Sequence, residues 1–293
     1  MSHSDSSSHR HSDRATQYSI YTDREHVKVA EMKGDGSEIL GTIGQFCEAM
    51  YHVKSNYNLN DQERSVKDGC LGSEQCSLGR YEYPKTAVAL VMFQKKNASS
   101  KEWETKSVRR YTNCYDDGKH AEDFFLSDII KNPLEDGEWR LTMYITMQPC
   151  NKSTGKTRGT PDDHSCCKTI LEAKDELNRN CKVELIIKPA HLMQAGWKKN
   201  EDSWDDKINN AEEGVKLLMK EGIKLEGLKK PDWDYLQQHI SDPKLPQYEG
   251  SGRETLDEDI ETFFARIRTA VKSEAKSEAD LAQLVARLNV QDN

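Results

Sequence analysis

The chain has 293 residues, a formal net charge of −8 and eight cysteines. Hydrophobic residues make up 35% of it and charged residues 31%, which is enough for one sizeable core surrounded by polar segments. No stretch approaches the roughly 20 apolar residues that span a bilayer, and residues 1–9 lack the apolar run of a signal peptide. The composition therefore excludes a membrane-spanning protein and a small disulfide scaffold. We expect a protein of the cytoplasm or nucleus without a membrane partner.

The acidic excess is confined to the last third of the chain, since residues 200–293 carry 21 acidic and 13 basic side chains. The remainder is neutral overall, and six basic side chains gather in residues 95–110 against two glutamates. Such a run is either a solvated surface or part of a groove for a polyanion. Net charge alone thus leaves nucleic acid open as a partner.

Residues 1–20 are rich in Ser, His and Asp, and we expect them to be disordered. Beyond them, apolar periodicity predicts strands that alternate with helices. The expected strands are 86–93, 103–112, 139–147, 183–187 and 223–228. The expected helices are 38–53, one starting near residue 119, 166–177, 206–221, a short one from residue 231, one opened by the capping box at residues 255–258, and further amphipathic turns over 277–289.

This alternation predicts an α/β fold in which a single five-stranded mixed sheet is flanked by helices, with extra C-terminal helices. One domain, residues 21–272, accounts for most of the chain. It lies between the disordered tail of residues 1–20 and a C-terminal helical extension of residues 273–293. Long irregular loops are expected over residues 151–165 and 191–206.

Three potential metal ligands stand at the ends of predicted elements. His120 and Glu122 form a His-Ala-Glu motif at a helix start, Cys150 follows a proline at a strand end, and Cys166 opens the next helix. One imidazole and two thiolates leave the fourth tetrahedral position of Zn²⁺ to a water, whose pKa falls from near 16 toward about 7. Glu122 then stands where a carboxylate can shuttle the proton. We therefore predict a catalytic zinc centre.

The other cysteines and histidines near these motifs leave alternatives open. Cys167 competes with Cys166 for the second thiolate position because the two are adjacent. His164 is either an extra ligand or, as we expect, a loop residue. Cys70 and Cys76 lie in a Gly/Ser-rich segment and are either free or paired in a disulfide.

The motifs resemble those of the zinc-dependent nucleobase deaminases, and among these the AID/APOBEC group of polynucleotide cytidine deaminases. Residues 119–126, Lys-His-Ala-Glu-Asp-Phe-Phe-Leu, are similar to that group's Arg-His-Ala-Glu-x-x-Phe-Leu helix start. Residues 144–150, Tyr-Ile-Thr-Met-Gln-Pro-Cys, resemble its Phe-x-Ser-Trp-Ser-Pro-Cys strand end. Residues 213–223 resemble its Gly-Leu-x-x-Leu-x-x-Ala-Gly segment, and the resemblance covers roughly residues 40–272.

The resemblance implies a cytidine deaminase-like fold, Zn²⁺ as the cofactor, and hydrolysis of cytosine to uracil in single-stranded DNA or RNA with Glu122 as proton shuttle. It also favours Cys166 over Cys167, because the family's helices begin with Cys followed by a small residue. One departure is the spacing of the cysteines: residues 151–165 separate them, where the family has about two to five residues.

The same resemblance points to residues that would bind the substrate. Asn113 and Arg110 precede the motif helix, and the loop after residue 187 would read a neighbouring base. Met147 and Gln148 stand where the family has Trp and Ser, which bears on base recognition. The expected substrate-binding residues are Asn113, Ala121, Arg110, Met147, Gln148, His191 and Trp197.

Two other functions use the same ligands. A catalytically inactive, zinc-stabilised member would bind nucleic acid without turnover. A deaminase of free cytidine would need the same centre, although the extra loops and C-terminal helices argue against a small-metabolite enzyme. The leading expectation is a deaminase of single strands, acting in mutation, editing or defence against foreign nucleic acid.

Overall fold

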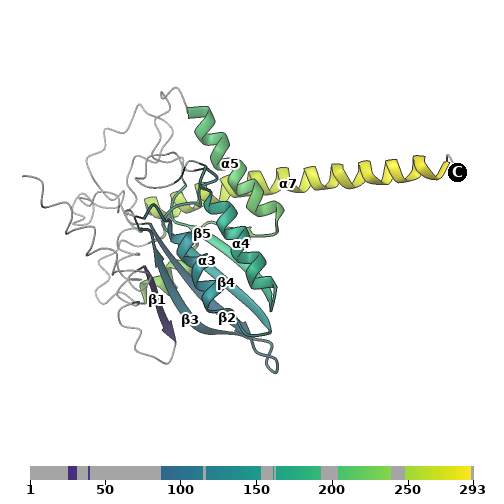
Figure 1. Ribbon diagram of the computed structural model, residues 1–293. Coiled ribbons are helices and arrows are strands. Elements are labelled where there is room, and N and C mark those ends of the chain that lie inside the picture. Colours follow the sequence, from purple (N-terminus) through teal and green to yellow (C-terminus); the bar gives the residue numbers. More distant parts are fainter. Residues whose placement is uncertain are drawn as a thin grey trace, which may run out of the picture.

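The computed structural model describes residues 26–31, 39, 87–114, 117–152, 161, 163–192, 204–238 and 248–291. Within these residues the chain forms one mixed sheet flanked by helices, which confirms the predicted α/β class (Figure 1). The strands are β1 (Val27–Glu31), β2 (Val88–Lys96), β3 (Trp103–Thr112), β4 (Glu138–Ile145), β5 (Lys182–Pro189) and β6 (Lys224–Leu225). The helices are α3 (Ala121–Lys131), α4 (Cys166–Asn178), α5 (Trp204–Lys220), α6 (Lys230–Gln237) and α7 (Gly252–Gln291).

The strand order in the sheet is β1-β3-β2-β4-β5-β6. The β1–β3, β3–β2 and β2–β4 pairs are antiparallel, whereas β4, β5 and β6 run parallel to one another. The connections β4–β5 and β5–β6 contain α4 and α5, respectively. A helix is the usual crossover between parallel strands, because the chain must return to the end of the sheet where the previous strand began. The carboxyl ends of β4 and β5 therefore lie side by side.

The predicted count of five strands is wrong, because β1 adds a sixth at the sheet edge. Val27 lies opposite Tyr111 and Glu31 opposite Ser107 in an antiparallel ladder with β3. The sequence of β1, Val-Lys-Val-Ala-Glu, is short and only weakly apolar. Pairing with a strand about 80 residues further along defines it, and local propensity does not report such contacts.

Alternation along β2 sends its side chains to the two faces of the sheet. Ala89, Val91 and Phe93 face the larger core, which includes apolar residues of α3, α4, α5 and α7. Leu90 faces a smaller core with Tyr144 of β4 and Trp233 of α6. The sheet is thus buried on both faces, and Figure 1 shows α3 and α4 lying across one of them.

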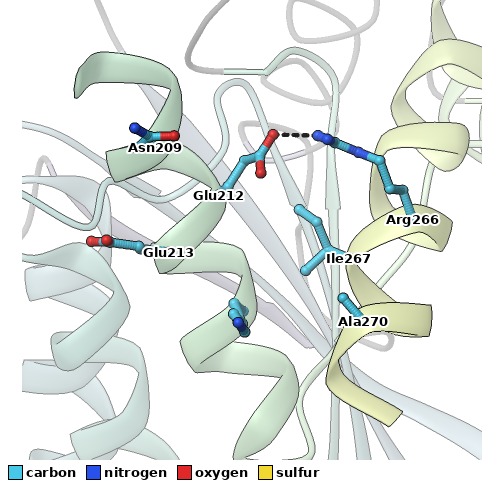
Figure 2. A pocket seen from close by; sticks show the side chains of 7 residues that line it. Asn209, Glu212, Glu213, Arg266, Ile267 and Ala270 are labelled. Atoms are coloured by element: carbon cyan, nitrogen blue, oxygen red, sulfur yellow. Dashed lines mark hydrogen bonds and ion pairs between the residues drawn. The ribbon is translucent and has the colours of Figure 1, made fainter. Parts of the chain in front are cut away.

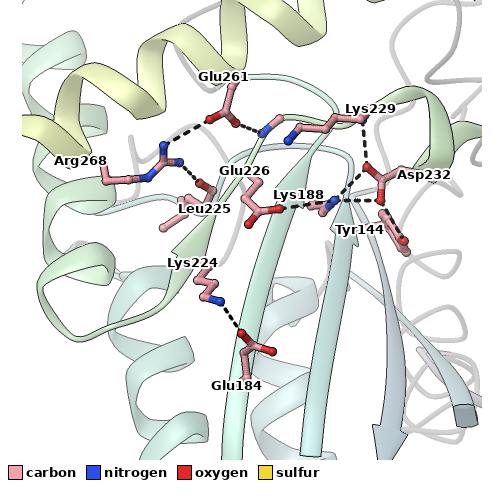
Figure 3. Close-up of polar contacts among 11 residues, drawn as sticks. Tyr144, Glu184, Lys188, Lys224, Leu225, Glu226, Lys229, Asp232, Glu261 and Arg268 are labelled. Atoms are coloured by element: carbon pink, nitrogen blue, oxygen red, sulfur yellow. Dashed lines mark hydrogen bonds and ion pairs between the residues drawn. The ribbon is translucent and has the colours of Figure 1, made fainter. Parts of the chain in front are cut away.

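Polar contacts join the last strands to the C-terminal helices (Figure 3). Lys188 of β5 forms ion pairs with Asp232 of α6 at 2.8 Å and with Glu226 at 3.5 Å. The hydroxyl of Tyr144 donates a hydrogen bond to Asp232 at 3.3 Å. Arg268 of α7 donates to the carbonyl of Leu225 in β6 at 2.8 Å. These contacts hold α6 and α7 against the parallel half of the sheet.

Helix α7 begins at Gly252, three residues before the predicted capping box, and continues without a break to Gln291. Ile260, Phe263 and Phe264 of its first half belong to the larger core. Its second half extends away from the sheet (Figure 1). The domain boundary predicted at residue 272 therefore falls inside one continuous helix, and residues 277–289 are part of it.

Several sequence predictions fall on residues outside the described ranges. Of the helix expected over residues 38–53, only Ile39 is described, and it is helical and buried. The tail of residues 1–20, the Cys70 and Cys76 pair and Trp197 also lie outside these ranges. In the described part of the chain, no helix is both long and apolar enough to cross a membrane.

Candidate metal centre

The centre lies where two helices begin beside the carboxyl end of β4. His120 is the N-cap residue of α3, in extended conformation, and Cys166 is the first residue of α4. Cys150 lies five residues beyond the end of β4, and its carbonyl accepts a hydrogen bond from the backbone N–H of Cys167 at 3.0 Å. This bond joins the start of α4 to the segment after β4. Ligand sites in sheets with parallel strands are commonly found at this edge.

Four side chains converge at this point: His120, Cys150, His164 and Cys166. Their ligand atoms all lie within 4.8 Å of one another, so the group could hold a metal ion. Nδ1 of His120 lies 3.0 Å from Sγ of Cys166 and 3.9 Å from Sγ of Cys150. Both cysteines are buried and neither is in a disulfide. Residues separated by 46 positions are thus brought into one group of nitrogen and sulfur donors.

The structure brings Cys166, and not Cys167, into this group. Sγ of Cys167 points to the carbonyl of Pro149, 3.6 Å away, and the side chain is fully buried in the larger core. A Cβ atom at Gly214 of α5 would lie 2.9 Å from this sulfur. Cys167 therefore serves as a small packing residue under α5. A side chain larger than glycine at position 214 would clash with its sulfur and push α5 away from α4.

His164 is the ligand candidate that sequence reasoning placed in a loop. Its ring lies 4.6 Å from the ring of His120, measured between centroids. Its Nε2 lies 3.0 Å from both carboxylate oxygens of Asp123. The spacing His164-x-Cys166 was the available signal, but the long segment before it obscured the connection to His120 and Cys150.

Asp123 organises the two helix starts. Its Oδ2 accepts a hydrogen bond from the backbone N–H of His120 at 2.7 Å, which caps α3. Its Oδ1 accepts one from the hydroxyl of Thr169 in α4 at 3.2 Å. The same carboxylate contacts His164. Sequence reasoning missed this role, since Asp123 reads there as one of two acidic residues in the first turn of a helix.

The pKa values of the Cys150 and Cys166 thiols are shifted in opposite directions. A hydrogen bond from Cys166 lowers the pKa of Cys150 to about 3, and His120 adds to the effect. Burial raises the pKa of Cys166 well above its usual value. Contact with the Cys150 sulfur, and then with Asp123, raises the pKa of His164 to about 9. A metal ion bound here would take the place of these protons, because thiolates and neutral imidazoles are the ligand forms.

Glu122 is the second residue of α3 and is only 4% exposed. Burial, followed by the charge of the Cys150 thiolate, raises the pKa of Glu122 to about 7, against an opposing effect of His120. A carboxyl group with such a pKa both holds and releases a proton near neutral pH. Glu122 is thus a buried carboxyl group with a raised pKa beside the candidate metal ligands.

The predicted substrate-binding residues occupy several different environments. The side-chain oxygen of Asn113 accepts a hydrogen bond from the backbone N–H of Ala87 at 2.8 Å. Gln148 is 3% exposed and donates to the carbonyl of Ala211 at 2.9 Å, and His191 is 1% exposed. Ala121 is fully buried, while Met147 and Arg110 are partly buried. The structure thus places Gln148 and His191 near the strand ends but turns both side chains away from solvent.

A hollow lies between α5 and α7 (Figure 2), and none of the four candidate metal ligands lines it. Its volume is about 310 Å³ and an ion pair between Glu212 and Arg266 crosses it. The lining residues are Asn209, Glu212, Glu213, Lys216, Arg266, Ile267 and Ala270. Its surface carries matched charges and none of the converging donors seen at the strand ends.

No protein-family model matches this chain, and no curated protein matches it. The class of the site therefore rests on its own chemistry. Two cysteines, two histidines and a buried carboxyl group at helix starts define a candidate metal centre with an adjacent acid–base group.

Proposed function

We propose that the protein is a zinc-dependent deaminase that hydrolyses cytosine to uracil in single-stranded DNA or RNA. The observation that carries the proposal is Glu122, buried beside the donors of His120, Cys150 and Cys166, with its pKa raised to about 7. The resemblance of the two motifs to those of the AID/APOBEC group supports the same reaction and suggests the base.

The donor set fits zinc. Thiolate and imidazole ligands in a compact group are the usual partners of Zn²⁺, and oxygen-preferring cations such as Mg²⁺ or Ca²⁺ would not select them. His120, Cys150 and Cys166 would hold the ion. Bound there, zinc would activate a water molecule as the nucleophile.

Glu122 would move the protons of the reaction. Its carboxylate takes a proton from the attacking water and delivers it to N3 of cytosine, and the second proton goes to the exocyclic amine. The C4–O bond forms, the C4–N4 bond breaks, and ammonia leaves. Burial keeps bulk water from the Glu122 carboxyl group and raises the pKa of that group.

A polymeric substrate must present its base outside a stacked duplex, so single strands are the expected form. Arg110 of β3, which the sequence suggested as a substrate contact, pairs with Leu90 of β2 and so lies on the face of the sheet away from α3. The acidic excess of residues 200–293 lies in other segments. With few cations to contact phosphates, we expect weak binding with a shallow salt dependence, because the slope of affinity against salt grows with the number of phosphates contacted.

The test uses the full chain loaded with zinc and four substrates: a cytosine-containing DNA single strand, the same strand as RNA, a duplex and free cytidine. We expect uracil in a single strand only. Glu122→Gln should retain zinc and lower the rate by about 10²- to 10⁴-fold, the usual contribution of an acid–base group. Glu172→Gln, which changes an exposed glutamate of α4, is the matched control and should leave the rate unchanged.

If only free cytidine is converted, the substrate is a nucleoside and the proposed polynucleotide substrate is wrong. Full activity in Glu122→Gln would overturn the proposed mechanism. Zinc retention without product from any substrate would favour the second candidate, a zinc-stabilised nucleic-acid-binding protein without turnover. One observation favours that candidate specifically: a fourth donor, His164, lies in the ligand group, and zinc sites with four protein ligands are usually structural.

A further inference from the structure

The position of His164 is fixed by the start of α4, and its ring lies beside that of His120. His164 lies two residues before Cys166 and directly before Ser165, whose side chain caps α4 by accepting a hydrogen bond from Lys168. This anchor places the His164 ring beside that of His120, at an interplanar angle of 42°. The helix start that carries one thiol therefore carries the second imidazole as well.

The two ring nitrogens of His164 face different surroundings. Nε2 lies 3.0 Å from Asp123, whose carboxylate is fixed by the backbone N–H of His120. Nδ1 is buried and makes no hydrogen bond of ordinary geometry within the described residues. An imidazole that donates one N–H to a carboxylate presents the lone pair of its other nitrogen, and metal-binding histidines are oriented in this way.

We propose that His164 is a fourth protein ligand of the metal held by His120, Cys150 and Cys166, and that Asp123 orients it. Two sulfurs and two nitrogens then complete a tetrahedral set, which is typical of zinc. The inference rests on the zinc centre of the proposed function. It adds that His164 would compete with the reacting water for the fourth position, so turnover would require this side chain to move away.

The experiment counts the imidazoles around zinc by X-ray absorption of the zinc-loaded full chain. We expect two imidazoles per zinc in the wild type and one in His164→Ala. Zinc affinity, measured by competition with a chromophoric chelator, should fall by about 10- to 100-fold in Asp123→Asn, the usual effect of losing a supporting carboxylate. His26→Ala is the matched control, because His26 stacks on Phe124 outside the group, and it should keep two imidazoles.

One imidazole per zinc in the wild type would overturn the inference and leave the proposed three-ligand centre intact. Two imidazoles in both the wild type and His164→Ala would assign the second ring to another histidine, which also overturns it. A wild-type chain that retains no zinc would overturn the proposed function as well. If His164→Ala does not fold, His164→Asn, which keeps polar character and much of the volume, replaces it in the count.

Discussion

The polar network around Arg253 and Asp257 and the cluster of His120, Cys150, His164 and Cys166 differ in whether hydrogen-bond donors face acceptors. At the start of α7, Arg253 donates hydrogen bonds to Asp257 and to the carbonyl of Ala190, the latter at 2.8 Å. The other oxygen of Asp257 accepts hydrogen bonds from Trp233 at 2.7 Å and from Tyr248 at 3.0 Å. Donors face acceptors throughout this network, and opposite charges are paired.

At the strand ends the arrangement is different, because four atoms with lone pairs face one another. His120, Cys150, His164 and Cys166 bring nitrogen and sulfur donors within 4.8 Å. The pKa of Cys150 is lowered by the hydrogen bond from Cys166, whereas burial raises the pKa of Cys166. Burial is common to both groups, so burial alone does not indicate function. The four-residue cluster differs from a structural ion pair because its nitrogen and sulfur atoms converge on one point, where a cation could bind them all.

The largest expected effect separates two adjacent cysteines. Cys166→Ser should lower zinc affinity by more than about 100-fold, beyond the loss usual for a supporting residue, because a thiolate ligand is removed. Cys167→Ser should retain zinc, since its sulfur faces the carbonyl of Pro149 and the serine hydroxyl can donate there. Competition with a chelator measures both affinities. Equal losses in the two variants would contradict the assignment of Cys166.

The second prediction removes the ion pair between Arg253 and Asp257. Arg253→Met leaves Asp257 buried without its cation, and such a change costs about 3–5 kcal/mol of the free energy of unfolding. Zinc stoichiometry should stay at the wild-type value because the metal donors are untouched. Denaturant unfolding of the zinc-loaded chain measures the first quantity and metal analysis the second. Loss of zinc from folded Arg253→Met would show that the two groups are not independent.

The smallest expected effect concerns the buried side chain of His191. Burial, followed by the charge of Arg253, lowers the pKa of His191 well below its usual 6.5. The unfolded chain therefore takes up a proton below pH 6.5 that the folded chain does not, so this contribution to stability is present at higher pH and lost as the pH falls.

Between about pH 7.5 and 5.5 the wild type should lose about 1.4 kcal/mol more unfolding free energy than His191→Gln. The difference between the two proteins isolates the histidine, because the metal group titrates in both. Denaturant unfolding at the two pH values provides the measurement. Parallel pH profiles for wild type and variant would mean that His191 has the same pKa in the folded and unfolded protein, which would contradict the lowered value.

The periodic elements could be predicted because their signals are local. The apolar runs over β2 and β4 and the amphipathic pattern of α4 each lie within a dozen residues. β1 could not, since its five residues become a strand through pairing with β3. The extent of α7 was also missed, because a charged stretch after residue 272 interrupts the apolar period without ending the helix.

The candidate centre shows the same division. His120, Glu122 and Cys150 stand in short motifs with recognisable residue types, so the sequence could single them out, and the structure brings His120 and Cys150 into one group. The choice between Cys166 and Cys167 depends on direction, because successive residues of a helix point about 100° apart. That direction is set by the packing of α4 against β5 and α5, where Cys167 contacts the core and Cys166 the donors.

The sequence by itself determined the α/β class, the helix starts and strand end that carry the ligands, and the carboxyl group next to the histidine. Only the tertiary structure brings His164 into one group with His120, Cys150 and Cys166 and places Asp123 in contact with it. The physical reason is that hydrophobic periodicity reports which face of an element is buried, whereas a metal site depends on where separate elements end in space. Here the parallel arrangement of β4 and β5 and the start of α4 bring those ends together.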